Sequence, residues 1–406
     1  MEKPTLISLY SGCGGSALGF QDAGFEINYM NDNNPDAYQT LMKNFQERSA
    51  NPERKIVHRE NIKDVFEFGS ADVIEGGFPC QGFSLAGPRK VDDKRNMLYH
   101  YLKRAITFAN PKFFVAENVK GFVTIGENGK GKFFEHGKIA KLGDVAAAIK
   151  SELETTGGGY KVHCEMLDAK DYGLPQDRKR IFIVGVRNDL DFKFEFPRPT
   201  HGEGLEPYVS MEKYMIPPSH IDSVKDIQSL ETEVDMEYFS SRYVSRNRIR
   251  KWDDVSFTIP AEAAQVPADP TCEKMWNTPD GKPPFEKKIV DGKPVVIKPI
   301  DKKIAPPLPK GFQGPIDMRE DWNGFRKKHD KDIAKDLRRM SWRQCAAIQG
   351  FPQHHIDNIQ GNAKSKYRQI GNAVPPLMMQ RIAECIKPHF EGKESSYPLK
   401  KEKITA

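Results

Sequence analysis

The chain has 406 residues, of which 38% are hydrophobic and 29% are charged, fractions that exclude the disordered and collagen-like classes. This length predicts a large domain of about 200 residues and a smaller one, with a cleft between them. The longest apolar runs are too short to cross a bilayer, and the first ten residues lack a basic start and a cleavage site, so we expect neither export nor a membrane partner.

The six cysteines lie far apart, at positions 13, 80, 164, 272, 345 and 385. Without a signal peptide, this scatter indicates reduced thiols and a cytoplasmic or nuclear location. The sequence has no C-x-x-C or H-E-x-x-H spacing, and no histidine lies within fifteen residues of Cys80. We therefore expect no metal site.

The first 195 residues alternate short apolar runs with amphipathic stretches, which predicts a largely parallel sheet with helices near 34–46, 96–109 and 140–156. The expected fold class is therefore α/β, a Rossmann-like domain. Residues 126–138 look like an inserted flexible loop. The strands are expected in these runs: TLISLY, EINYM, KIVH, DVIEGG, KFFVAE, KVHCEML and RIFIVGV.

The alternation ends near residue 195, which predicts a smaller, irregular, mostly β domain at 196–335. Within it, the lysine- and proline-rich stretch 282–310 favours a surface loop over a contact surface. A regular pattern returns at 340–351 and 376–386. The predicted organisation is a catalytic domain at 1–195, a second domain at 196–335, a hinge at 336–363, a return to the catalytic domain at 364–390 and a flexible tail at 391–406.

A glycine-rich loop follows the first predicted strand, where Gly12, Gly14 and Ala17 fit the G-x-G-x-x-A pattern. Asp32, twenty residues after Gly12, ends the second strand and can accept hydrogen bonds from ribose hydroxyls. Asn61 and Ile62 follow the third strand and are candidates for contacting an adenine ring. The pattern predicts a cofactor that contains adenosine, and it leaves a nicotinamide dinucleotide and S-adenosylmethionine both open.

The segment GGFPCQGFS places Cys80 at the carboxyl end of the fourth predicted strand, where open α/β sheets bind ligands, so we interpret it as a nucleophile. Glu117 ends the next strand and can protonate a ring nitrogen if it is desolvated. Arg178 and Arg180 share one face of a later strand and suit a carbonyl oxygen or a phosphate. Asn372 opens a candidate backbone clamp for the amino-acid end of a cofactor.

Together, LISLYSGCGGSALGF, GGFPCQGFS, AENVKG, QDRKRIFIVG and YRQIGNAVPP resemble signature blocks of the DNA (cytosine-5)-methyltransferases. The resemblance implies that Cys80 adds to C6 of a flipped-out cytosine, that Glu117 protonates N3, and that Arg178 and Arg180 support the base and its phosphates. It departs from the family at Ser8, where many members have Asp, at Asn61, a frequent Asp, and at Ala373, a Ser in some relatives. The residues that would bind S-adenosylmethionine are Tyr10, Ser11, Gly12, Gly14, Gly15, Asp32, Asn33, Asn61, Ile62, Pro79, Asn372, Ala373 and Val374.

The resemblance also implies that the second domain reads double-stranded DNA. Its segment YVSRNRIRKWDDVSFTI is similar to the target-recognition segment of a branch that includes enzymes reading GGCC. We expect a monomer that protects DNA in a restriction-modification system, with a cognate restriction endonuclease as functional partner. The candidate DNA-contacting residues are Ser84, Arg89, Arg246, Arg248, Arg250 and Thr258.

Two other functions compete with this one. A transfer-RNA cytosine-5 methyltransferase shares the catalytic blocks, but it carries Cys-Phe-Thr where this chain has Ser256, Phe257 and Thr258. A nicotinamide-dependent oxidoreductase shares the glycine pattern, but it gives no joint role to Cys80, Glu117 and the arginine pair.

Overall fold

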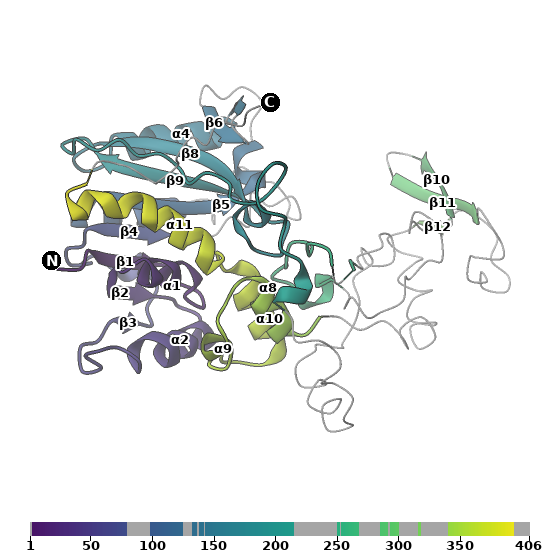
Figure 1. The fold of residues 1–406 in the computed structure, drawn as a ribbon, viewed down its shortest axis with the longest axis horizontal. Coiled ribbons are helices and arrows are strands. Elements are labelled where there is room, and N and C mark those ends of the chain that lie inside the picture. Colours follow the sequence, from purple (N-terminus) through teal and green to yellow (C-terminus); the bar gives the residue numbers. More distant parts are fainter. Residues whose placement is uncertain are drawn as a thin grey trace.

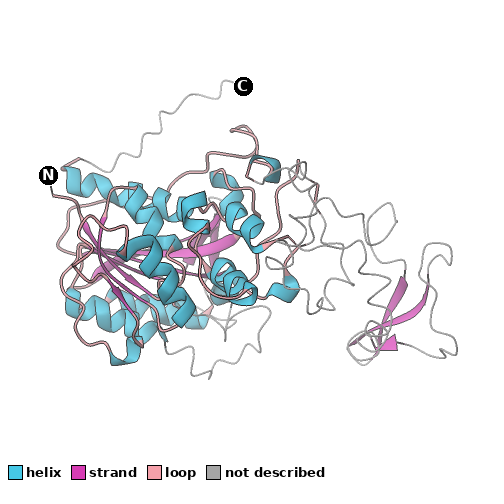
Figure 2. Cartoon of the chain, turned by 90° about the horizontal axis from the view of Figure 1, so that it is seen from below, coloured by secondary structure: helices cyan, strands magenta, loops and turns pink. Residues whose placement is uncertain are grey.

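The structure, a computed structural model, describes residues 2–78, 98–124, 132–135, 138–141, 143–214, 250–251, 253–267, 285–290, 293–299, 316–317 and 340–393. Its main body is a sheet in the order β3-β2-β1-β4-β5-β9-β8-β6-β7, with helices on both faces (Figures 1 and 2). The strands are β1 (Thr5–Leu9), β2 (Glu26–Asn31), β3 (Val57–His58), β4 (Val73–Gly76), β5 (Phe113–Val119), β6 (Lys132–Glu135), β7 (Lys138–Lys141), β8 (Tyr160–Asp168) and β9 (Lys179–Arg187).

The first five strands form the parallel half of this sheet. Strand β1 pairs in parallel with β2 and β4, β2 pairs with β3, and β4 pairs with β5. Strand β9 is antiparallel to both β5 and β8, so the sheet is mixed beyond β5. The α/β class expected from the alternating runs is confirmed, and the carboxyl ends of β1, β2, β4 and β5 meet at one edge.

The side chains of β5 alternate between two cores, as the two-residue period of a strand requires. In β5, Phe113 and Val115 join the core beneath α1 (Gly15–Asp22) and α11 (Pro376–Ile386), whereas Phe114 and Ala116 join the core beneath α3 (Tyr99–Ala109) and α4 (Asp144–Glu154). The same period turns Glu117 to the α1 side of the sheet.

Helix α11 returns the chain to the amino-terminal half by packing against α1 (Figure 1). A Cβ at Gly19 of α1 would lie 2.3 Å from the carbonyl oxygen of Pro376, so the two helices approach more closely than a larger side chain permits. The range 376–386 expected for this helix is confirmed. The other α-helices among the described residues are α2 (Pro35–Leu41), α8 (Trp342–Ile348), α9 (Gln353–Ile356) and α10 (Ala363–Asn372).

Short π- and 3-10 helices connect these elements. Among the described residues, none of the helices is both long and apolar enough to cross a membrane. In the described ranges, the π-helix η1 (Met42–Gln46) continues α2, and the 3-10 helices are η2 (Ile62–Asp64), η4 (Lys120–Thr124), η5 (Ala169–Tyr172), η6 (Met211–Lys213), η8 (Ala263–Gln265) and η9 (Lys387–Glu391).

Two segments expected as loops contain strands. The stretch 126–138 includes β6, which forms a hairpin with β7 and pairs in parallel with β8. The stretch 282–310 includes β10 (Phe285–Val290) and β11 (Lys293–Pro299), which form an antiparallel sheet with β12 (Ile316–Asp317). Glycine, proline and lysine hid these strands because such residues are depleted in strands. The predicted tail lies outside the described residues from 394 onward.

Candidate functional site

A cavity of about 550 Å³ opens at the carboxyl ends of the parallel strands. This volume is within the range of small-molecule sites, and this edge is where open α/β sheets bind ligands. The walls come from the loop after β1, the ends of β2, β4 and β5, the start of β9 and the end of α10. The predicted residues that line it are Tyr10, Ser11, Gly12, Gly15, Asp32, Asn33, Asn61, Ile62, Glu117, Arg178, Arg180, Asn372, Ala373 and Val374.

The loop after β1 forms one wall and needs its glycines. Gly12 and Gly14 have φ of 56° and 86°, in the left-handed region that favours glycine. A Cβ at Gly15 would lie 2.2 Å from the carbonyl oxygen of Val374, so this loop touches the segment after α10. Gly14 itself packs against Phe45 and does not line the cavity.

Asp32 ties this loop to the end of β2. Its Oδ2 accepts the backbone N–H of Gly12 at 2.9 Å, and its Oδ1 accepts that of Asn34 at 2.8 Å. Burial raises the pKa of the Asp32 carboxyl, and these backbone donors oppose the shift. Because each carboxylate oxygen carries a second lone pair, the group retains acceptor capacity toward the cavity.

Asn61 caps η2, since its side-chain oxygen accepts the backbone N–H of Lys63 at 3.1 Å, and the neighbouring Ile62 is buried. Arg104 of α3 braces this turn by donating to the carbonyl oxygens of Ile62 and Lys63. Arg104 was not predicted, because only the fold brings α3 to this loop.

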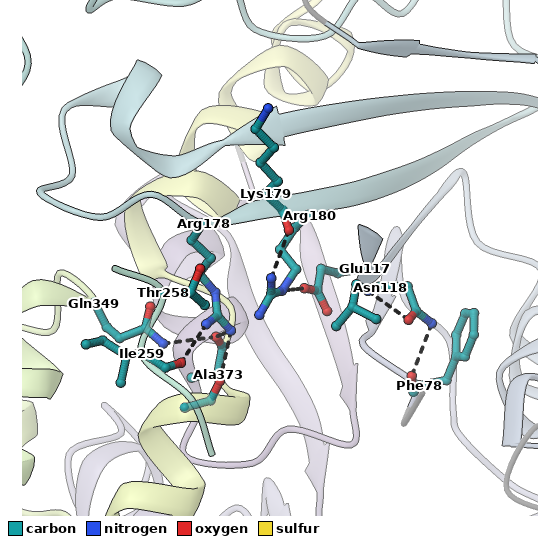
Figure 3. A network of polar contacts seen from close by, with 12 residues as sticks. Phe78, Glu117, Asn118, Arg178, Lys179, Arg180, Thr258, Ile259, Gln349 and Ala373 are labelled. Atoms are coloured by element: carbon teal, nitrogen blue, oxygen red, sulfur yellow. Dashed lines mark hydrogen bonds and ion pairs between the residues drawn. The ribbon is translucent and has the colours of Figure 1, made fainter. Parts of the chain in front are cut away.

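Glu117 and Arg180 form the charged centre of the site (Figure 3). Arg180 Nε lies 2.9 Å from Glu117 Oε1, and both side chains are almost fully buried. The pairing follows from the register, because Arg180 stands opposite Val119, two residues beyond Glu117 on the same face. Burial raises the pKa of the Glu117 carboxyl, while Arg180 and then Arg178 oppose the shift.

The chain that leads to Cys80 passes beside Glu117. A Cβ at Gly77 would lie 3.4 Å from Glu117 Oε2, and the Asn118 side chain donates to the carbonyl oxygen of Phe78 at 3.4 Å (Figure 3). The end of β4 is thus held against the end of β5. Cys80 itself lies outside the described residues.

Arg178 differs from the role expected for it. Its side chain is fully buried, and its guanidinium donates to the carbonyl oxygens of Ile259 at 3.2 Å, Gly371 at 3.0 Å and Ala373 at 2.8 Å (Figure 3). Burial lowers the pKa of this guanidinium. Arg180 thus contacts Glu117, whereas Arg178 joins three backbone segments; both line the cavity, and the support of a base or phosphate expected of them stays a prediction.

Two predicted DNA-contacting residues are described, and both make intramolecular contacts. The Thr258 hydroxyl donates to the carbonyl oxygen of Asp177, and the Arg250 guanidinium lies 4.2 Å from the Phe257 ring centroid and 3.4 Å from Asp254. Neither lines the cavity. The other predicted site residues lie outside the described residues: Pro79, Cys80, Ser84, Arg89, Arg246 and Arg248.

Sequence reasoning missed the contribution of α10. Ser365, Arg368 and Gln369 line the cavity from one side of this helix, so the site extends before the predicted Asn372. The sequence did contain a signal for this helix, because Tyr367, Ile370 and Gly371 recur at helical spacing and form its buried face.

A doubly covered α/β sheet with a glycine loop, an acid at the end of β2 and a cavity at the carboxyl ends of the strands is the Rossmann-like fold of methyltransferases. Solved structures share this fold: the Schizosaccharomyces pombe Dnmt2 methyltransferase matches with a TM-score of 0.53 at 17% identity, covering 95% of this chain and 99% of that one. The Entamoeba histolytica methyltransferase EhMeth matches with a TM-score of 0.52 at 15% identity, covering 97% and 99%.

The particular family follows from sequence. Residues 5–388 match the model of the C-5 cytosine-specific DNA methylase family, and the chain belongs to this family. It is 33% identical to the type II methyltransferase M.BspRI of Lysinibacillus sphaericus, over 95% of this chain and 82% of that protein. It is also 33% identical to M.MthTI of Methanothermobacter thermautotrophicus, over 95% and 98%. The protein is therefore a DNA cytosine-5 methyltransferase.

Proposed function

We propose that this enzyme methylates C5 of a cytosine flipped out of double-stranded DNA, through a transient covalent bond between Cys80 and C6. The observation that carries the proposal is the buried Glu117–Arg180 pair, which lies beside the end of β4. Only Gly77 and Phe78 separate this strand from Pro79 and Cys80 in the sequence. Burial raises the pKa of the Glu117 carboxyl, which favours its protonated form, and a protonated carboxyl can protonate a ring nitrogen.

The chemistry then proceeds in balanced steps. The Cys80 thiolate adds to C6 while Glu117 delivers a proton to N3, so the ring becomes an enamine and C5 becomes nucleophilic. Arg180 keeps the Glu117 carboxyl in place. After methyl transfer, a base removes the C5 proton, the C5–C6 double bond reforms, the Cys80 sulfur leaves as a thiolate, and N3 returns its proton to Glu117.

The cavity fits S-adenosylmethionine, which supplies the methyl group when bound. Gly12 and Gly15 let the backbone approach a ligand closely, and Asp32 has acceptor capacity for ribose hydroxyls. Tyr10, Ser11 and Asn33 belong to the same wall, and Asn61 and Ile62 to the adenine end. Pro79 would adjoin the transferred methyl group. We assign the segment Asn372 to Val374 to the amino-acid end, because Gly15 touches Val374 there.

Base recognition is assigned to the second domain. We propose that residues 196–335 read the sequence with Arg246, Arg248 and Arg250, because arginine pairs with guanine by two hydrogen bonds. Ser84 and Arg89 are assigned to the gap left by the flipped base, and Thr258 to the border between the domains. We propose that methylation protects host DNA beside a cognate restriction endonuclease, and that the enzyme acts as a monomer.

Duplex DNA containing 5-fluorocytosine tests the covalent step, because fluorine at C5 blocks release of the cysteine. We expect wild type with S-adenosylmethionine to form a complex that survives denaturing electrophoresis, and Cys80→Ser to form none. The target must be found first, by sequencing 5-methylcytosine in DNA from cells that express the protein. Trapping by Cys80→Ser, or no trapping by active wild type, contradicts the adduct. Methyl transfer from tritiated cofactor to transfer RNA but not to duplex DNA contradicts the DNA assignment.

A further inference from the structure

A chain of buried polar groups lies beneath the glycine-rich loop, and the reaction described above leaves it unused. Glu75 of β4 is 1% exposed and stands in register with Ser8 of β1. Its carboxyl group contacts the Ser8 hydroxyl and hydrogen-bonds the Ser16 side chain at the start of α1. The Ser8 hydroxyl lies 2.8 Å from that of Ser11, which in turn lies 3.0 Å from the Ser8 carbonyl oxygen.

Counting hydrogens shows which form of Glu75 satisfies this chain. Three contacts run from Glu75 to the Ser8 hydroxyl, on to Ser11 and back to the Ser8 carbonyl oxygen. The two hydroxyls supply only two hydrogens, so an ionised Glu75 leaves one contact without a proton, whereas a protonated carboxyl supplies the third. Burial acts in the same direction, since it raises the pKa of Glu75 to about 8, with the nearby Glu117 adding to the shift.

Glu75 lies beside the position at which this sequence departs from many members of its family. Ser8 stands where many family members have Asp, yet a carboxyl group is still present here, supplied by the neighbouring strand. Because Ser8 and Glu75 are register partners in parallel strands, the two side chains reach the same space beneath the loop. Ser11 and Ser16, at the other end of the contacts, line the cavity.

We propose that Glu75 is the positioning residue of the cofactor loop in this enzyme, replacing from β4 the carboxyl group that relatives supply from β1. It holds Ser8 and Ser16 so that residues 11–16 keep the shape that receives S-adenosylmethionine. This inference rests on the assignment of the cavity to the cofactor.

Calorimetric titration of S-adenosylmethionine into the full-length protein tests the proposal. We expect Glu75→Val to weaken cofactor binding about tenfold or more, since it misplaces the loop. Glu75→Gln retains a donor and an acceptor and is expected to bind within about threefold of wild type. The swap Ser8→Asp with Glu75→Ser returns the acid to β1 and should recover affinity that Glu75→Ser alone loses.

Glu165→Val is the matched control, because this acid lies on β8 of the same sheet, away from the cavity, and burial also raises its pKa, to about 7. It should leave cofactor affinity unchanged. Wild-type affinity for Glu75→Val, or a swap no better than Glu75→Ser, overturns the proposal. If the valine variant does not fold, the swap decides, since a swap that binds cofactor supports the proposal and one that does not refutes it. Failure of wild type to bind S-adenosylmethionine would instead refute the proposed cofactor site.

Discussion

Replacing Glu75 by Gln should change how the stability of the protein depends on pH. Burial raises the pKa of this carboxyl from its ordinary 4.5 to about 8, so the folded state keeps a proton that the unfolded state releases. The stabilisation is fully present below pH 4.5 and is lost as the pH rises toward 8. Glutamine does not titrate, and its amide offers the Ser8 hydroxyl both a donor and an acceptor, as a protonated carboxyl would.

The magnitude follows from the shift. Each pH unit within this window costs the wild type about 1.4 kcal/mol of unfolding free energy, or about 5 kcal/mol over the whole window. Between about pH 5.5 and 7.5, Glu75→Gln should therefore gain about 2 to 3 kcal/mol relative to wild type. The sign is fixed: the stability of the variant compares least favourably with that of wild type in acid and most favourably at about pH 8 and above.

Urea unfolding followed by circular dichroism at several pH values measures this difference directly. Glu26→Gln, which neutralises a half-exposed carboxylate on β2, controls for the change in net charge. Curves of unfolding free energy against pH that run parallel for wild type and Glu75→Gln, within about 0.5 kcal/mol, would refute the reasoning. They would mean that Glu75 is ionised in the folded protein.

Three further changes have distinct expected outcomes. Gly371→Ala places a Cβ 2.2 Å from the carbonyl oxygen of Pro260 and should cost about 1 to 3 kcal/mol in urea unfolding, whereas Gly76→Ala, with its nearest neighbour at 3.3 Å, should cost less. Arg178→Lys leaves buried carbonyl oxygens unpaired and should lower the unfolding free energy by about 1 to 3 kcal/mol. Arg180→Lys should lower the methylation rate with a smaller loss of unfolding free energy than Arg178→Lys. Equal losses of rate and of unfolding free energy in the two variants would contradict the separate roles of these arginines. Glu117→Gln should lower single-turnover methylation about 100-fold or more, and the wild-type rate should fall as the pH rises through the raised pKa of Glu117, because only the protonated carboxyl can deliver a proton; a rate for Glu117→Gln equal to wild type would exclude this role.

The sequence was most informative where chemistry depends on local pattern. Short apolar runs predicted the strands. The glycines predicted a loop after the first strand, and Asp32 was placed at the end of the second, because both belong to one βαβ unit. The hairpin of β6 and β7 was missed, because glycine and lysine dominate its sequence and its partner β8 lies farther along the chain.

Contacts between distant segments could not be predicted. The spacing of two residues between Arg178 and Arg180 predicted that their side chains share one strand face. It could not predict which groups each side chain contacts. The partners of Arg178 lie 81 to 195 residues away, at Ile259 and at the end of α10. Ser8 and Glu75 are 67 residues apart, and only the register of two parallel strands brings them together. The available signal was Glu75, an acid that follows the apolar residues Val73 and Ile74 inside a predicted strand.

The division between the two arginines bears on the pKa of Glu117, which has two cations nearby. Both guanidinium groups lower this pKa, and burial outweighs them. Arg178 directs its guanidinium to three carbonyl oxygens, so of these two arginines it is Arg180 that contacts the carboxyl directly. Glu75, protonated up to about pH 8, adds little negative charge below that value. The ion pair with Arg180 is thus the main contact that lowers the pKa of Glu117. Removing the Arg180 side chain should therefore raise this pKa further than removing the Arg178 side chain.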